Sequence, residues 1–298
     1  MIRRLFWQAL GLLLAALALC VAIAVVRVAP IDVRGLARRP PTRTAMMLER
    51  EREAHAQRRY YQESWHWVPL ERISATLRRA VLVAEDDKFF THDGLDWDEI
   101  RISAQRNLRA HKIVRGGSTI TQQLAKNLWL GSSRTPWRKF EELILAMRLE
   151  RELTKRRILE LYLNTIEWGD GIYGVDAASR YWFGVSAGGL DAGQSIRLAA
   201  VVINPRRFSP VTPDERIENR IKTIASRLRR RGAITEEQYR VTLGLPPEAE
   251  APAVDSTLLA PPATSADTIA VPPFEDQPPS FEPVAPDSGT VDTLEILR

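Results

Sequence analysis

The stretch that most constrains this chain is an uncharged run from Leu5 to Val26. Its residues are mainly Leu, Ala, Val and Ile, and at roughly 1.5 Å per residue a helix of this length crosses a hydrocarbon core of about 30 Å. We therefore expect one transmembrane helix over residues 5–26. A cleaved signal peptide is the competing interpretation, but its apolar core is usually about 7 to 15 residues long, and no clear small-x-small site precedes the charged flank.

Positive charges on both sides of this run leave its orientation open. Arg3 and Arg4 precede it, and four arginines follow it within residues 27–39. Because topology depends on the charge of both flanks, the sequence favours neither direction strongly. We expect residues 1–4 to be a short cytoplasmic segment only because the function inferred below requires the body on the other side.

The rest of the chain divides into three parts by composition. Residues 27–64 are rich in Arg and Glu without a sustained apolar stripe, which predicts a polar stalk or a loosely packed helix. Over residues 65–245 apolar residues recur at helical spacing, so we expect a mostly α-helical body with a sizeable core. Residues 246–298 hold 11 of the 19 prolines, and this composition predicts a disordered tail.

Charge is distributed unevenly along the chain. The tail carries ten acidic residues and one basic residue, so the preceding residues are more basic than the overall charge of +5 indicates. The positive charge of residues 1–245 predicts an anionic partner, which could be nucleic acid, an anionic membrane surface or a phosphorylated substrate. The only cysteine, Cys20, lies in the apolar run, so an intramolecular disulfide is impossible.

Glu85 is the first candidate for chemistry, because it extends an apolar helical stripe. Its carboxyl reaches the edge of an apolar surface, where partial desolvation would raise its pKa and make it a usable general base. The acidic cluster that begins there is more often a solvated helix end, and His92 alone is more often structural than catalytic. The stripe consists of Ile73, Leu77, Ala80, Val81 and Ala84.

A second candidate begins at Gly116-Gly117-Ser118, which leads into a helix with the capping pattern Thr119-x-x-Gln122. Such a helix start offers backbone N–H groups to an anion. Gln122 and Lys126 are four apart and would share a polar face able to hold sugar hydroxyls and phosphate. An ordinary capped amphipathic helix explains the pattern slightly better on its own, and no Gly-Lys-Ser/Thr follows to make a Walker loop.

Two cationic clusters follow. Arg138 and Glu142 lie one turn apart, which places a base and a carboxylate on one face, although a surface ion pair has the same spacing. Residues 155–157 are Lys-Arg-Arg and come shortly after Arg148 and Arg151. This density of cations predicts either a solvated face or a site for pyrophosphate and membrane headgroups.

In order and spacing, these four blocks resemble the peptidoglycan glycosyltransferases of glycosyltransferase family 51, particularly the monofunctional, single-pass members. The patterns E-D-x-x-F-x-x-H-x-G, G-S-T-I-x-Q-Q-L-x-K-N, R-K-x-x-E and K-x-x-I-L-E-x-Y-L-N are present at every fixed position. The resemblance covers roughly residues 65–230. It is looser in the fifth family block, which matches only at Arg220 and Ile224, and Ile203 stands where Leu is expected.

The resemblance implies a mostly α, lysozyme-like, two-lobed glycosyltransferase domain, preceded here by the single transmembrane helix. It implies that Glu85 is the general base, which takes a proton from the 4-hydroxyl of the acceptor, and that Glu142 is the second carboxylate, which assists the leaving group. The two should be about 6.5 Å or more apart, by analogy with inverting glycosidases. The implied substrate contacts are Ser118, Gln122, Gln123, Lys126, Arg138, Lys139 and Lys155.

The implied reaction is polymerisation of lipid II into β-1,4-linked glycan strands with inversion and release of undecaprenyl pyrophosphate. The expected partners are lipid II, the growing glycan chain and the membrane, together with other cell-wall synthesis proteins through the tail, and not nucleic acid. A divalent cation, Mg²⁺ or Mn²⁺, could assist, and no organic cofactor is expected. We expect the protein in the inner membrane with its catalytic domain on the periplasmic side. Trp97, Trp129 and Trp137 suit either that interface or the core equally well.

Two rival functions remain open at this stage. A lysozyme-like hydrolase or lytic transglycosylase would use a single acidic Glu and would not need the cationic helices, and a membrane scaffold would need only the anchor and the tail. A transpeptidase in the same chain is excluded, because none of the six lysines has Ser three residues before it.

Overall fold

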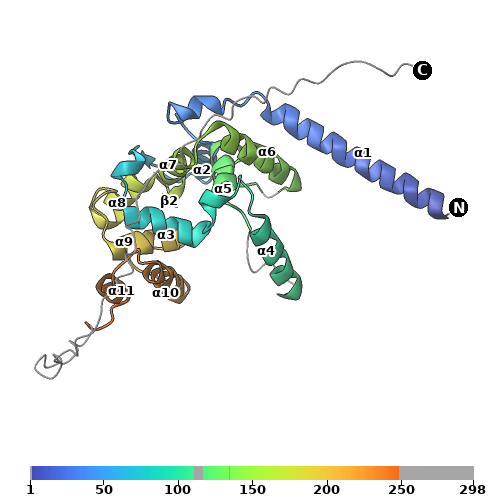
Figure 1. Cartoon of the computed structure of the whole chain (residues 1–298). Coiled ribbons are helices and arrows are strands. Elements are labelled where there is room, and N and C mark those ends of the chain that lie inside the picture. Colours follow the sequence, from blue (N-terminus) through green and yellow to red (C-terminus); the bar gives the residue numbers. More distant parts are fainter. Residues whose placement is uncertain (1, 111–116, 134, 248–298) are drawn as a thin grey trace, which may run out of the picture. The chain divides into compact units, whose positions relative to one another are not determined.

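A computed structural model describes residues 2–110, 117–133 and 135–247, and this part of the chain is mostly α-helical, as predicted (Figure 1). The α-helices are α1 Ile2–Val28, α2 Ala45–Ala56, α3 Ala75–Glu85, α4 Trp97–Ala110, α5 Ile120–Ala125, α6 Pro136–Glu152, α7 Lys155–Thr165, α8 Val175–Phe183, α9 Ala192–Val201, α10 Glu215–Arg230 and α11 Glu236–Leu243. Single turns of tighter or wider helix are η1 Arg34–Ala37, η2 Leu70–Arg72, η3 Phe89–Thr91 and η4 Lys126–Leu130.

The core forms where α3 packs against α9. Leu77, Ala80 and Val81 of α3 are buried, which confirms the predicted apolar stripe, and they lie in one cluster with Ile196 and Ala199 of α9. Helices α10 and α11 both pack on α9 as well. Since α3 is fixed on these neighbours, the position of its C-terminal residue, Glu85, is fixed with it.

A small sheet closes one edge of the core. Its strands are β1 Ser64–Trp65, β2 Glu167–Gly169 and β3 Ile172–Tyr173, in the order β1-β3-β2. Strand β3 is parallel to β1 and antiparallel to β2, with Glu167 opposite Tyr173. Strands of two or three residues are too short to show alternation in a sequence, so the helical pattern of residues 65–245 gave no sign of them.

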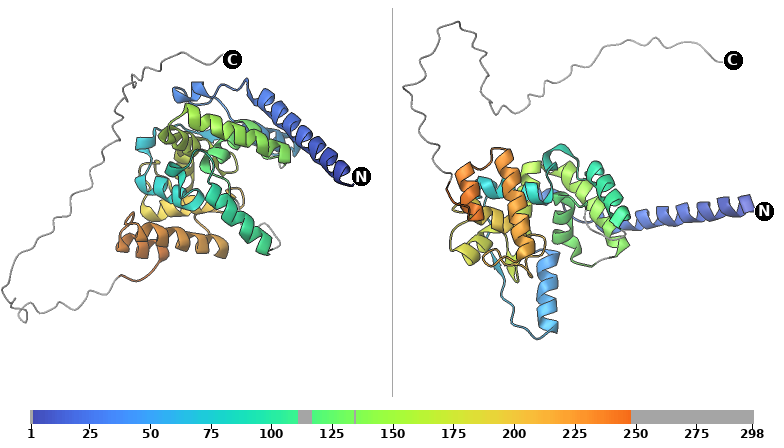
Figure 2. Two further views of the ribbon diagram at one scale, coloured as in Figure 1. Left: turned by 45° about the vertical axis from the view of Figure 1, so that its right-hand side comes forward. Right: turned by 90° about the horizontal axis from the view of Figure 1, so that it is seen from below.

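Helix α1 contains the predicted membrane-spanning run. Over Phe6–Val28 it has a mean hydropathy of 2.9 and is only 6% buried, and it is the one helix in the described residues long and apolar enough to cross a membrane. Figure 2 shows its N-terminal part extending away from the other helices. Its last turns pack on α6, where Ala24 and Val28 are buried and Arg148 donates to the carbonyl oxygen of Val28.

Residues 27–64 differ from a free polar stalk, because this segment packs on the body and contains the helix α2. Val33 and Leu36 belong to the main core, and Met46 and Met47 of α2 are buried against Tyr173. The segment folds in short pieces, each of which buries one or two apolar residues against the body. Because these pieces are shorter than a helical repeat, the sequence shows no stripe there.

Helix α4 is set apart from this core. None of its described side chains joins the main apolar cluster, and the helix projects from the body in Figure 1. Apart from Pro246 and Pro247, the tail predicted over residues 246–298 lies outside the described residues.

Candidate active site

Glu85 ends α3 with its side chain only 13% exposed. One carboxylate oxygen lies 2.5 Å from Nη2 of Arg220 on α10, and the other accepts a hydrogen bond of 3.0 Å from Nε2 of Gln123 on α5. Burial raises the pKa of Glu85, although the charge of Arg220 and the bond from Gln123 act against it. Glu85 therefore holds a proton more readily than a surface carboxylate, as a general base requires.

A buried tyrosine fixes the amide of Gln123. The hydroxyl of Tyr162 on α7 donates to Oε1 of Gln123 at 2.8 Å, and Tyr162 is fully buried. Since Oε1 accepts from the tyrosine, Nε2 is left to donate to Glu85. Three helices thus orient the carboxylate of the candidate base.

Asp86 and His92 have structural roles. Asp86 is buried, and it accepts from Nε2 of His92 at 3.0 Å and from the backbone N–H of Ile120 at 2.9 Å. The second contact places the carboxylate of Asp86 at the N-terminus of α5, where the positive end of the helix dipole stabilises a negative charge. His92 also accepts from the N–H of Gly94, so it is the hydrogen-bonded turn residue that the sequence favoured.

Glu142 lies among cations on α6. One of its oxygens accepts from Nη1 of Arg138 at 2.7 Å, the other accepts from Nζ of Lys139, and its side chain is buried. Lys139 also donates to Oγ of Ser118 at 3.1 Å. The ion pair between Arg138 and Glu142 is therefore part of a network that reaches the start of α5, and not an isolated surface pair.

Lys126 begins a single π-helical turn, η4, directly after α5. Burial lowers its pKa, and the negative charge of Glu142 acts in the opposite direction. Such turns are frequent at functional sites because they re-aim side chains. Here the turn carries a partly buried ammonium beside the cations of α6.

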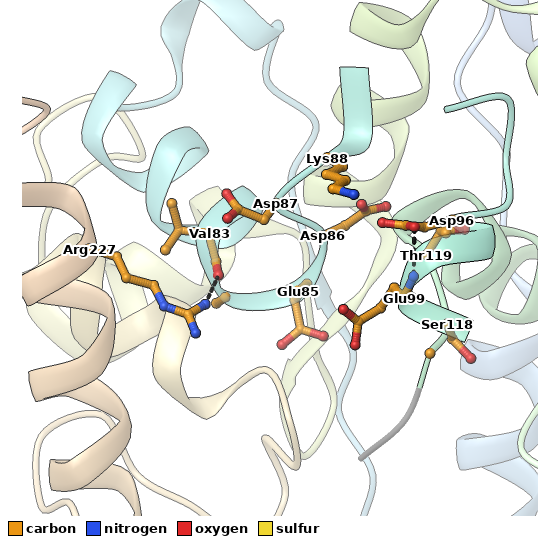
Figure 3. A pocket seen from close by; sticks show the side chains of 12 residues that line it. Val83, Glu85, Asp86, Asp87, Lys88, Asp96, Glu99, Ser118, Thr119 and Arg227 are labelled. Carbon is orange, nitrogen blue, oxygen red and sulfur yellow. Dashed lines mark hydrogen bonds between the residues drawn. The ribbon is translucent and has the colours of Figure 1, made fainter. Parts of the chain in front are cut away.

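Several of these side chains line two hollows, whereas Lys139 and Glu142 line neither. The first, about 220 Å³, is lined by Glu85 and Ser118 and is mainly acidic (Figure 3). The second, about 350 Å³, is lined by Gln123, Lys126 and Arg138 and is rich in cations. The bond between Glu85 and Gln123 links the two, so the candidate base lies between an acidic hollow and a cationic one.

The structure does not place Gln122 in either hollow. Its side chain is 3% exposed, and Oε1 accepts from the backbone N–H of Thr119. The predicted capping pattern is confirmed, but the predicted polar face is wrong. Helix α5 is buried on almost all sides. Gln122 therefore caps the start of this helix and is not placed to contact a ligand.

Lys155 is also displaced from its expected place. Its Nζ donates to the carbonyl oxygen of His92 at 2.5 Å and to Glu150 at 2.8 Å, and lies 4.5 Å from the ring centre of Phe89. It lines neither hollow. An ammonium with these partners holds the loop after Glu85 in place, and it has little capacity left for a pyrophosphate.

The donor set offers a divalent cation a poor fit. Both oxygens of Glu142 are paired with Arg138 and Lys139, and no group of three or more His, Cys, Asp or Glu suited to a metal occurs in residues 2–110, 117–133 and 135–247. Oxygen-rich sites of several ligands are what Mg²⁺ prefers.

Sequence reasoning missed several residues that shape the site. Arg220 was noted only as a loose match to a fifth family block, yet its guanidinium contacts Glu85. Arg50 fell in the supposed stalk, and Arg206 and Glu167 belonged to no block, although all three line the cationic hollow. Of the three tryptophans, only Trp97 is exposed, at 70%.

A largely buried carboxylate beside an acidic hollow and a second, buried carboxylate among cations are typical of an acid–base enzyme for an anionic substrate. Comparison with known proteins narrows this class. The model of the transglycosylase family matches residues 51–229, and the chain belongs to this family. The match begins within α2, which agrees with the packing of that helix on the body.

Several curated relatives carry the name biosynthetic peptidoglycan transglycosylase. The one from Laribacter hongkongensis is 45% identical over 188 residues, which are 63% of this chain and 82% of the relative. The one from Methylobacillus flagellatus is 48% identical over 163 residues, 55% of this chain and 71% of the relative. The one from Chromobacterium violaceum is 54% identical over 142 residues, 48% of this chain and 62% of the relative.

Proposed function

We propose that this transglycosylase polymerises the glycan strands of bacterial peptidoglycan from lipid II, with inversion and release of undecaprenyl pyrophosphate. The observation that carries the proposal is the largely buried carboxylate of Glu85, held by Arg220 and Gln123 between an acidic and a cationic hollow. The names of the relatives support the same activity.

In the proposed reaction, Glu85 takes the proton from the 4-hydroxyl of the acceptor sugar. That oxygen attacks the anomeric carbon of the donor from the face opposite the leaving group, and a new C–O bond forms as the bond to pyrophosphate breaks. The electron pair stays on the pyrophosphate, whose negative charge is stabilised by Lys126, Arg138 and Lys139. Preorganised charges of this kind are usually the largest single contribution to such catalysis.

In this proposal Glu142 positions the side chains of Arg138 and Lys139, because each of its two oxygens accepts a hydrogen bond from one of them. Glu142 thereby orients the two cations toward the leaving group and away from Glu85. Two predictions are untested: that a divalent cation assists the reaction, and that the carboxylates of Glu85 and Glu142 lie about 6.5 Å or more apart.

The location follows from the substrate. A lipid-linked precursor stays in the bilayer, so we propose that α1 anchors the protein in the inner membrane, with residues 1–4 in the cytoplasm and the domain on the periplasmic side. The membrane, lipid II and the growing chain are then its partners, and nucleic acid is not. Recruitment of other cell-wall proteins by the tail is proposed on its composition alone.

The test is polymerisation of fluorescent lipid II in detergent by the wild-type protein and by Glu85→Gln. We expect a lysozyme-sensitive ladder from the wild type and a loss of at least about a thousandfold in rate from the variant, because the amide cannot accept the proton. Circular dichroism checks that the variant is folded. A wild-type protein that cleaves preformed glycan and makes no polymer would instead establish the hydrolase.

A further inference from the structure

One buried polar atom in the cationic hollow has no partner. Oε2 of Glu167 accepts from Nε of Arg50 at 3.1 Å, whereas Oε1 has no hydrogen bond to any described residue. Nε of Arg206 lies 3.9 Å from it, within ion-pair range but too far for a hydrogen bond. The side chain is only 8% exposed. A buried oxygen left in this state costs about 1–3 kcal/mol, so it calls for an explanation.

The surroundings hold Glu167 rigidly toward the hollow. It lies on β2, opposite Tyr173 of β3, and the residue itself lines the cavity together with Gln123 and Tyr162. Burial raises the pKa of Glu167, and the charges of Arg50 and Arg206 oppose this rise. The carboxylate is thus fixed in orientation by one arginine while its second oxygen remains available to a ligand.

The two arginines are secured by residues outside the hollow. Glu53 of α2 accepts from Nη1 of Arg50 at 2.9 Å and from Nη1 of Arg206 at 3.2 Å. Asp170 lies 3.4 Å from Nε of Arg206. Because other carboxylates already pair with these arginines, Glu167 is not needed merely to neutralise them.

The hollow is lined by cations and by one carboxylate, Glu167, whose neighbouring arginines are also paired with Glu53 and Asp170. Lys126 and Arg138, beside Glu142, suit a phosphate. A carboxylate repels phosphate and accepts hydrogen bonds from O–H and N–H groups, so Glu167 suits a neutral donor of hydrogen bonds. Hydroxyl and acetamide groups of an amino sugar have this chemistry, and the sugars of a glycan are the neutral part of the proposed donor.

We propose that Glu167 binds a sugar of the growing glycan by accepting an O–H or N–H hydrogen bond at Oε1, and so positions the donor chain with its pyrophosphate at Lys126 and Arg138. This inference rests on the proposed function. It makes Glu167 a residue for recognition of the chain, separate from the base and from the cations around the leaving group. It also makes α2, which supplies Arg50, part of the binding site.

The test compares Glu167→Ala and Glu167→Gln with the matched control Glu53→Gln. All three remove a carboxylate that contacts Arg50, but Glu53 does not line the hollow. We measure KM and kcat for a lipid-linked tetrasaccharide as donor, at saturating lipid II, and the melting temperature of each protein. For Glu167→Ala we expect KM to rise about tenfold, equivalent to about 1.4 kcal/mol, with kcat changed less than threefold.

Glu167→Gln retains one acceptor oxygen and should lie between wild type and Glu167→Ala, whereas Glu53→Gln should keep the wild-type KM. An unchanged KM in folded Glu167→Ala overturns the proposal, and so does an equal rise in Glu53→Gln, which would make the effect one of arginine placement.

Failure of the polymerase itself is detected separately. Binding of a soluble, unreactive glycan tetrasaccharide is followed by isothermal titration calorimetry with the full chain in detergent. If the wild type makes no polymer but binds the fragment about tenfold more tightly than Glu167→Ala does, the sugar site stands and only the reaction is wrong. Equal binding by the two proteins overturns the sugar site.

Discussion

At the scale of single residues, the proton affinity of Glu85 is set by neighbours that act in opposite directions. Burial raises its pKa, whereas Arg220, Gln123 and Lys126 lower it. The net effect is a raised pKa, so burial is the stronger influence. A base arranged in this way is ionised above its pKa and still binds a proton more strongly than an exposed carboxylate.

Arg220→Gln should therefore shift the pH dependence of the reaction. Removing the guanidinium raises the pKa of Glu85 further, so the base becomes ionised only at higher pH, and the acidic limb of the kcat/KM profile moves upward. At neutral pH we expect kcat/KM to fall about tenfold or more. Arg220→Lys keeps a charge and should restore part of the shift.

The matched control is Arg229→Gln on the same helix, because Arg229 pairs with Glu236 at the surface. Its profile should coincide with that of the wild type. If Arg220→Gln lowers activity equally at every pH, the arginine acts on substrate or fold and not on the proton affinity of Glu85.

The sequence predicted single residues well where a local pattern determines the environment. The end of an apolar stripe was enough to place Glu85 at the edge of the core. The sequence failed for Lys155, since its partner, the His92 carbonyl, comes from a segment distant in the chain. It failed for Gln122 because this side chain is buried and caps its own helix through Thr119. Spacing alone cannot show which face of a short helix is covered.

At the scale of elements, the π-helical turn η4 depends on α2. The carboxylate of Glu49 accepts from the backbone N–H and from the hydroxyl of Ser132, both at 2.6 Å. Gly131, just before Ser132, has φ +70°, and a Cβ at this position would clash with the carboxylate of Glu49. Helix α2 thus closes the turn that carries Lys126.

Glu49→Ala should loosen this turn. The loss of two charge-assisted hydrogen bonds is expected to cost about 1–3 kcal/mol, a fall in melting temperature of about 2–10 °C for a domain of this size. Hydrogen exchange at residues 126–132 should increase, and kcat should fall because Lys126 is less well placed. The control Glu51→Ala removes a carboxylate of α2 that pairs with Arg43 near the surface, where such pairs contribute about 0–1 kcal/mol. Equal effects in the two variants would count against a specific role for Glu49.

Elements with their own repeat were predictable, and those without one were not. The stripe of α3 and the capping pattern at Thr119 are written in residues a few positions apart, and the structure has both. Residues 27–64 fold because Val33, Leu36 and Met47 each find a partner in the body. The residues that stabilise this segment lie elsewhere in the chain, so the sequence of residues 27–64 alone does not predict how it folds.

At the scale of the whole molecule, the anchor and the enzyme are joined by packing, and not by a free linker. Arg27 at the end of α1 lies 2.8 Å from Glu141 of α6, the helix that also carries Glu142. Arg148 of α6 donates to the carbonyl oxygens of Val28 and Ile31. The bilayer would therefore fix the height of α6, and with it the cations of the site.

Two truncations separate anchoring from folding. Removing residues 1–26 deletes the membrane-spanning run but keeps the core residues after it, so this protein should leave the membrane fraction and melt close to the wild type. Removing residues 1–40 also deletes Val28, Val33 and Leu36, which are buried in the main core. A fully buried Val or Leu contributes about 1.5–3 kcal/mol, so the second protein should lose several kcal/mol and unfold at much lower temperature. Thermal unfolding in one detergent measures both. If the two truncated proteins melt at the same temperature, residues 27–40 do not stabilise the fold and act as a polar stalk.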